Sequence, residues 1–196
     1  MEDLAHDVRE ADDEGDARGG VAGAGAPSPF APAGTQTLVR TRASADPLAA
    51  LPERAFDNLL VVAARDHPSK LERRLERVDH DPSRVGVVPA APAAREYDGD
   101  LWTTDYVSPE DLTGLGMRFS DALQYVESGT GWVVVDSLGV LLMYADDSRV
   151  CRFVQTVTNR VRAKEVHGVY GVNPDAVADE TYEQLRAMCD AEYEVE

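Results

Sequence analysis

The chain has 196 residues, of which 36 are Asp or Glu and 19 are Lys or Arg, so its net charge is −17 at pH 7. A field of this sign repels phosphate backbones and anionic lipid headgroups, which excludes nucleic acid and membrane surfaces from the expected partners. The length fits one ordinary domain and leaves no room for a second.

The kind of basic residue and the cysteines indicate where the protein works. Only Lys70 and Lys164 are lysines, and this bias with the excess of acid is typical of adaptation to concentrated salt. Cys151 and Cys189 form no CxxC pair, so we expect neither a disulfide framework nor structural zinc. The acidic N-terminus is unlike a signal peptide, and the longest apolar run, residues 132–144, is too short to cross a bilayer. We expect a cytoplasmic protein.

Residues 1–53 are expected to be a disordered tail in front of a domain at residues 54–196. The tail carries 10 acidic and 4 basic residues and is rich in Gly, Ala and Pro, so it buries too little apolar surface to offset its ordering entropy. Within it, Thr37–Thr41 could add a short edge strand. The glycines of Gly19–Gly25 follow no strand and precede no helix, which favours a linker over a phosphate-binding loop.

The domain opens with a strand, a helix and a second strand. Residues 58–63 form a short apolar run, typical of a strand buried on both faces. Pro68 fits the first turn of a helix. The apolar positions that then recur at helical spacing are Leu71, Leu75 and Val78. Residues 84–88 predict the second strand.

A Pro- and Ala-rich loop at 89–100 and a short strand at 101–107 are expected next. Ser108 and Pro109 then supply a capping hydroxyl and a first-turn proline, which predict the start of an amphipathic helix that ends near Gly129. The apolar face of this helix consists of Leu112, Leu115, Phe119, Ala122 and Val126.

The rest of the chain continues the alternation of strands and helices. Strands are expected at 132–136, 166–172 and 192–195, with helices beginning near Asp147 and Asp179. Strands separated by helices of this length pair in parallel through crossover connections. The predicted fold class is therefore α/β, a three-layer α/β/α arrangement with a mostly parallel sheet.

Candidate site residues follow from this fold, because ligands of open parallel sheets bind at the carboxyl ends of the strands. The residues expected there are Asp66 and His67 after the first strand, Asp136 and Ser137 after the strand at 132–136, and Asn173 with Asp175 after the strand at 166–172. We assign none of them a catalytic role and expect them to line a crevice.

Asp136 and Ser137 have the form of a Walker B segment, in which the carboxylate organises magnesium. Hydrophobic strands also end in Asp for structural reasons, because the carboxylate accepts backbone hydrogen bonds at the turn. Residues 63–70 read AARDHPSK and hold none of the glycines of a GxxxxGK[ST] loop. Such a backbone cannot wrap a triphosphate, and Asp66 would set negative charge against it. We expect no cofactor and no metal.

Two other functions stay open. An atypical nucleotide-binding ATPase or hydrolase would use Asp136 with His67 as general base, although no motif places a Ser or Cys nucleophile beside the imidazole. A receiver-like signalling domain would need two adjacent acidic residues after its first strand, where only Asp66 stands. His167 falls inside a strand and is interpreted as a partly buried, hydrogen-bonded residue, since no HxH or HExxH pattern exists.

Two segments resemble the later half of the RecA/KaiC-type ATPase core, DLTGLGMRFSDAL at 111–123 and VVVDSLGVLLMY at 133–144. More closely, the chain resembles a family of uncharacterised haloarchaeal proteins, sometimes labelled HTR-like, that share this core. The segments that carry this second resemblance include NPDA at 173–176, the helix start DET at 179–181 and the closing AEYEV at 191–195. The resemblance implies a degenerate RecA/KaiC-like domain that has kept the scaffold and lost the Walker A loop.

The leading hypothesis is a non-catalytic regulatory or scaffolding protein that acts in signalling through protein–protein contacts. Its partner would be another protein, bound at the carboxyl-end crevice, and a homo-oligomer is compatible with the sequence. The acidic tail would be a flexible appendage.

Overall fold

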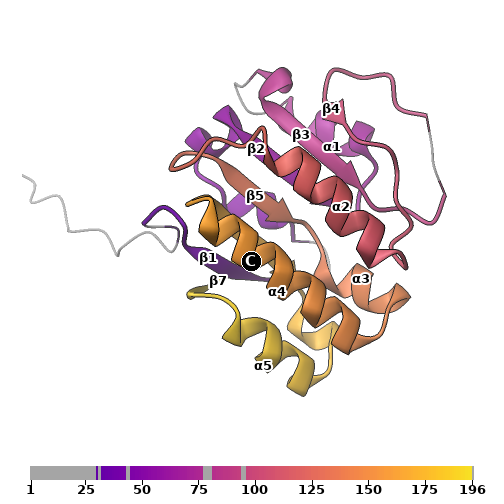
Figure 1. Ribbon diagram of the computed structural model, residues 1–196, viewed down its shortest axis with the longest axis vertical. Helices are drawn as coiled ribbons and strands as arrows, with labels where there is room; N and C mark the ends of the chain where they lie inside the picture. Colours follow the sequence, from indigo (N-terminus) through magenta and orange to yellow (C-terminus); the bar gives the residue numbers. More distant parts are fainter. Residues whose placement is uncertain (1–29, 31, 43–44, 77–80, 94–95, 196) are drawn as a thin grey trace, which may run out of the picture.

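The computed structural model describes residues 30, 32–42, 45–76, 81–93 and 96–195. Within these residues seven parallel strands form one sheet in the order β4-β3-β2-β5-β6-β1-β7 (Figure 1). The strands are β1 Gln36–Thr41, β2 Leu59–Ala63, β3 Val85–Pro89, β4 Trp102–Thr103, β5 Trp132–Val135, β6 His167–Val172 and β7 Ala191–Val195.

Helices lie on both faces of this sheet, so the fold is the predicted three-layer α/β/α arrangement. The α-helices are α1 Pro68–Leu75, α2 Leu112–Leu123, α3 Leu138–Tyr144, α4 Asp147–Ala163 and α5 Asp179–Ala187. The short 3-10 helices are η1 Pro47–Ala50, η2 Glu53–Asp57, η3 Pro82–Arg84 and η4 Pro174–Ala176.

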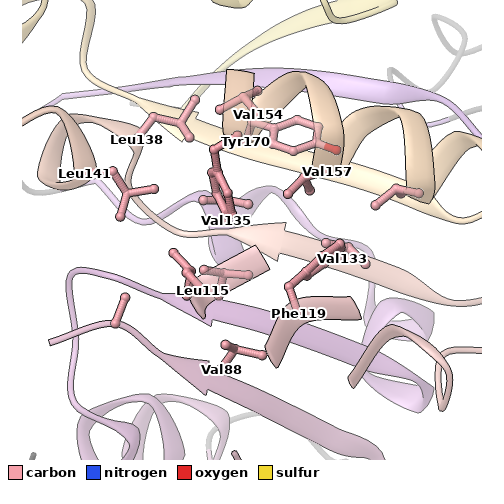
Figure 2. Packing of buried hydrophobic residues seen from close by; sticks show 14 of the residues in the cluster. Val88, Leu115, Phe119, Val133, Val135, Leu138, Leu141, Val154, Val157 and Tyr170 are labelled. Carbon is pink, nitrogen blue, oxygen red and sulfur yellow. The ribbon is translucent and has the colours of Figure 1, made fainter. Parts of the chain in front are cut away.

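The two faces of β5 show why its sequence is apolar throughout. Val133 and Val135 pack into the cluster under α2, α3 and α4, which Figure 2 shows together with Phe119 and Tyr170. Trp132 and Val134 point into the opposite cluster, which also holds side chains of α1, η1 and η2. Because successive side chains of a strand alternate between faces, a strand buried on both sides needs an unbroken apolar run.

Strand β1 departs from the expected tail. The sequence predicts at most a short edge strand at Thr37–Thr41, but β1 lies inside the sheet between β6 and β7. Leu38 and Val39 are fully buried in the two opposite clusters. The boundary predicted at residue 53 therefore differs from the structure for residues 36–41, whereas residues 1–29 lie outside the described residues.

Several helix ends also differ from the expectation. Helix α2 begins at Leu112, because the Asp111 carboxylate accepts from the Gly114 N–H at 2.9 Å and takes the capping role predicted for Ser108. Helix α3 was not predicted.

Two other expectations concern the first helix and the fourth strand. Val78, expected on the first helix, lies outside the described residues. The strand expected at 101–107 is reduced to β4 and one bridge at Val107.

No helix in the described part of the chain is long and apolar enough to cross a membrane.

Candidate functional site

The crevice lies at the carboxyl ends of β2, β3 and β5. Strand β2 is hydrogen-bonded to both β3 and β5, so the segments that leave these three strands meet at one edge of the sheet. A cavity of about 360 Å³ opens there. It is lined by residues 63–67, by 89–93, by Tyr106 and Pro109, and by α3 through Val140, Met143 and Tyr144.

Asp136 faces the backbone of the segment that follows β2. Its Oδ1 accepts from the Ala64 N–H at 2.8 Å, and its Oδ2 accepts from the Arg65 N–H at 3.1 Å. The register that pairs Val62 with Val135 places Asp136 directly beside this turn. Two amides at the position where a phosphate-binding loop would present its N–H groups are thus bonded to a side chain of the same chain.

Burial makes Asp136 an unusual carboxylate. The residue is 7% exposed, and desolvation raises its pKa to about 7. The hydrogen bonds from Ala64 and Arg65 lower the pKa, but the nearby negative charges of Asp66 and Asp46 raise it further. Loss of water is the largest of these effects, because a charge in a low-dielectric site lacks solvation that two amides only partly replace.

Asp66 belongs to an ion-pair network that joins α1 to the segment after β1. Its carboxylate, 6% exposed, lies 2.6 Å from Lys70 Nζ and 2.6 Å from an Arg74 guanidinium nitrogen. The same nitrogen of Arg74 also lies 2.7 Å from Asp46. Lys70 is paired with Asp66 although its own side chain is 55% exposed.

His67 caps helix α1 and borders the cavity. Its Nδ1 accepts from the Ser69 N–H at 3.2 Å and lies 2.8 Å from the Ser69 hydroxyl. The ring packs between Tyr97 and Tyr106, with ring centroids 6.2 and 6.0 Å away. Its Nε2 is buried and has no hydrogen-bond partner within the described residues. The imidazole thus keeps one polar atom unused beside the cavity.

Ser137 and Asn173 serve local turns. Ser137 caps α3, because its hydroxyl accepts from the Val140 N–H at 3.3 Å. Asn173 caps η4, because its Oδ1 accepts from the Asp175 N–H at 3.1 Å. Neither side chain lines the 360 Å³ cavity, which Asp66 and His67 do line. The structure brings Asp136 to the segment that holds Asp66 and His67, and it gives Ser137 and Asn173 capping bonds.

Arg74, Asp46 and Tyr106 are the neighbours of this site that the sequence analysis missed. Asp66, Lys70 and Arg74 recur every four residues, a spacing that places them on one side of α1 and that could have revealed the network. Asp46 and Tyr106 come from distant segments, and no local pattern marks them.

Metal ligands do not gather anywhere in the described residues: no group of three or more His, Cys, Asp or Glu could hold an ion there. Cys151 is buried in α4, Cys189 is half-buried after α5, and both are free thiols. Burial raises the pKa of each thiol. His167, buried at the start of β6, stacks on Trp132, and desolvation lowers its pKa.

The sequence of residues 33–195 matches the model of a protein family described as a family of unknown function, DUF7504. The chain belongs to this family. The matched range begins three residues before β1, so the family's domain includes this strand, which the sequence predicts to lie in the tail. No curated protein matches the chain in sequence.

The fold of this chain is similar to that of several solved structures of archaeal proteins. A KaiC-like protein from Pyrococcus horikoshii OT3 superposes with a TM-score of 0.59 at 9% identity, over 84% of this chain and 73% of that one. The flagellar accessory protein FlaH from Methanocaldococcus jannaschii gives 0.58 at 11% identity, over 84% and 72%. Another Pyrococcus horikoshii OT3 protein gives 0.56 at 13% identity, over 85% and 84%. At such identities the likeness establishes a RecA/KaiC-like fold and no activity.

Proposed function

We propose that this protein is a regulatory or scaffolding member of the RecA/KaiC-like fold that acts through protein contacts and does not hydrolyse nucleotides. The observation that carries the proposal is the pair of hydrogen bonds from Ala64 and Arg65 to Asp136. Amides that would otherwise face a phosphate are satisfied internally, and a ligand would have to displace a buried carboxylate to reach them.

The charges around the turn support the same conclusion. Asp46, Asp66 and Asp136 surround it, and the charges of the first two raise the pKa of the third. Arg65, the cation of the turn itself, donates from its guanidinium to the Ala45 carbonyl at 2.7 Å, and Lys70 pairs with Asp66. A triphosphate would therefore meet three carboxylates against the single guanidinium of Arg65, which disfavours its binding.

The solved structures that share the fold of this chain support an accessory role. One is named a KaiC-like protein and another a flagellar accessory protein, and both carry the same scaffold. The acid-rich, lysine-poor composition supports work in concentrated salt, and we propose a cytoplasmic location for the chain.

A second candidate is an atypical ATPase or hydrolase that uses Asp136 with His67. The cavity of about 360 Å³ and the buried, unpartnered Nε2 of His67 favour it, because together they offer space and an unused polar atom. The hydrogen bonds of Asp136 speak against it, because its carboxylate oxygens are held by the backbone.

Isothermal titration of the full chain with ATP and Mg²⁺, with a phosphate-release assay in parallel, tests the proposal. We expect no saturable heat at millimolar ATP and no release of phosphate. Micromolar binding with turnover would overturn the proposal. If Asp136→Asn and His67→Ala each abolished that turnover while the exposed variant Asp121→Asn kept it, the second candidate would stand. If ATP is neither bound nor hydrolysed, affinity purification at high salt would identify the protein partner that the first candidate requires.

A further inference from the structure

A groove between α2 and α4 lies away from the crevice and has a charge opposite to that of the whole chain. Its volume is about 660 Å³. Figure 1 shows these two helices side by side on one face of the sheet. The lining residues that matter here are Gly116, Met117 and Asp121 of α2 and Arg149, Arg152 and Arg160 of α4.

The three arginines have no carboxylate partner within the described part of the chain. Arg149 donates to the Glu110 carbonyl at 3.2 Å, and Arg152 donates to the Ser148 carbonyl of its own helix at 3.3 Å. All three are exposed and lie on one side of α4. By contrast, Arg162 near the end of the same helix is paired with Asp190 at 3.0 Å. Against three cations the groove contains one carboxylate, Asp121.

The α2 side of the groove leaves room for an apolar contact. A Cβ at Gly116 would meet no atom within 4 Å, so the helix surface is open there. Met117 beside it is 65% exposed. A flexible thioether next to open space can adapt to an apolar side chain of a partner segment.

Residues 2–16, which precede the described residues, have the complementary chemistry. They contain eight carboxylates and one arginine, with Leu4 and Val8 as apolar residues four positions apart. Residues 17–29 form the connection to Phe30, which packs against Trp132 with ring centroids 5.4 Å apart. Fully extended, such a connection spans about 45 Å. Phe30 lies in the cluster on the sheet face opposite to the groove, so the chain has to pass around an edge of the sheet. A domain of this size is roughly 40 Å across, and residues 2–29 span about 95 Å when fully extended, so part of the acidic segment can reach the groove.

We propose that the acidic segment at residues 2–16 binds the groove of Arg149, Arg152 and Arg160 in the same molecule. Carboxylates of the segment pair with the three guanidinium groups, and an apolar side chain contacts Met117. Exposed ion pairs are individually weak, so the contact relies on the high effective concentration of a tethered segment. Salt screens exposed ion pairs, so the contact forms at low ionic strength and opens in concentrated salt, and another acidic segment can displace it.

This intramolecular contact would give the domain a self-blocked interaction surface. A protein partner with an acidic stretch would compete with residues 2–16 for the same arginines. The inference does not rest on the crevice, because no residue of the groove lines the 360 Å³ cavity. Nucleotide binding at the crevice would therefore leave it standing.

The test follows backbone amide signals of the ¹⁵N-labelled full chain by NMR. Between 50 mM and 1 M NaCl, we expect the amides of Gly116, Met117 and Ser120 to shift in the wild-type protein. In a segment variant with Asp12→Asn, Asp13→Asn, Glu14→Gln and Asp16→Asn, these amides should lie closer to their high-salt positions already at 50 mM. The salt-induced shifts should fall by more than half.

Two further variants make the result specific. A control variant removes four charges elsewhere, through Glu96→Gln, Asp98→Asn, Asp100→Asn and Asp175→Asn, and should keep the wild-type shifts. A groove variant with Arg149→Gln, Arg152→Gln and Arg160→Gln should lose them, and adding the segment substitutions to it should change nothing more. Equal shifts in segment and control variants would overturn the proposal. Shifts that fade on twentyfold dilution would also overturn it, because they would place the segment of a second copy in the groove.

Discussion

At the scale of single residues, Asp136 explains how a turn without glycines can leave β2. The Ala64 and Arg65 N–H groups need acceptors, and the carboxylate supplies one oxygen to each. Burial removes water from the carboxylate and so destabilises its ionised form. The two hydrogen bonds offset only part of this destabilisation. The protein therefore contains a buried acid that titrates near neutral pH.

The pH dependence of stability should show this acid. Because burial raises the pKa of Asp136 from 3.8 to about 7, the folded state binds more protons than the unfolded state between these values. The stabilisation from the bound proton is complete below the unfolded pKa and is lost as pH rises through the folded pKa. From pH 5 to pH 7, the wild type should lose about 2 kcal/mol relative to Asp136→Asn, measured by urea unfolding.

The comparison with Asp136→Asn isolates one group from all others that titrate in this range. Asp121→Asn, which removes an exposed carboxylate of α2, is the matched control for the loss of one charge. A constant difference between the wild type and Asp136→Asn across pH 5 to 7 would show that the carboxyl group is not buried as described.

Arg74 is a second residue on which the crevice depends. Its guanidinium bridges Asp46 and Asp66, and the Asp66 side chain is only 6% exposed. Arg74→Met keeps most of the aliphatic stem but leaves that buried carboxylate with Lys70 alone. We expect a loss of about 2 kcal/mol in the free energy of unfolding, because a desolvated charge that loses a partner is costly.

Arg73→Met provides the control for Arg74→Met. Arg73 is the preceding residue of α1, and among the described residues its side chain donates only to the Ser69 carbonyl of its own helix. Its substitution should change the unfolding free energy by less than about 0.5 kcal/mol. If chemical denaturation gave the same loss for both variants, the ion-pair network would contribute nothing measurable.

At the scale of elements, two glycines differ in whether the structure leaves room for a side chain. A Cβ at Gly171 in β6 would lie 2.6 Å from the Asp136 carbonyl oxygen and 2.8 Å from Pro47 Cγ. Gly171→Ala would therefore push β6 away from its neighbours and should cost about 2 kcal/mol. Gly116→Ala in α2 meets open space and should stabilise the protein by about 0.5–1 kcal/mol, since alanine favours a helix.

Thermal unfolding of Gly171→Ala and Gly116→Ala under the same conditions measures both effects with one kind of substitution. The midpoints should move in opposite directions from that of the wild type. Equal shifts would mean that backbone entropy, and not the contact with Asp136 and Pro47, decides the outcome.

Elements with a strong local pattern could be predicted from the sequence. The apolar runs of β2, β3, β5 and β6 and the periodic face of α4 indicate buried strands and an amphipathic helix without knowledge of their neighbours. Strand β1 could not be placed in the same way. It is polar at both ends, and its position between β6 and β7 is decided by pairing with strands more than 120 residues away.

Local competition explains the remaining differences between prediction and structure. Helix α3 is seven residues long and follows β5 after two residues, so its apolar side chains read as a continuation of the strand. Ser108 has the right residues around it for a cap, but Asp111 lies where its carboxylate reaches the Gly114 amide. At the crevice, the residue types of Asp66, His67 and Asp136 could be predicted, whereas their hydrogen-bond partners required the register of β2 against β5.

At the scale of the whole molecule, the net charge of −17 acts on every part of the fold. Ion pairs such as Arg186 with Glu192 and Arg162 with Asp190 offset it locally. Exposed carboxylates such as Asp98 and Asp175 make no ion pair within the described residues and repel one another through solvent. Self-repulsion of this kind destabilises the compact state more than the expanded one.

Salt should therefore stabilise the protein. Raising NaCl from 0.1 M to 1 M shortens the Debye length from about 10 Å to about 3 Å, which screens repulsion between distant carboxylates but spares buried pairs such as Asp66 with Arg74. We expect the thermal midpoint to rise by about 5 °C. A variant with Glu96→Gln, Asp98→Asn, Asp121→Asn and Asp175→Asn should start from a higher midpoint and gain less. Sorbitol at matched osmolality separates screening from solvent exclusion, and an equal gain in sorbitol would reject the electrostatic explanation.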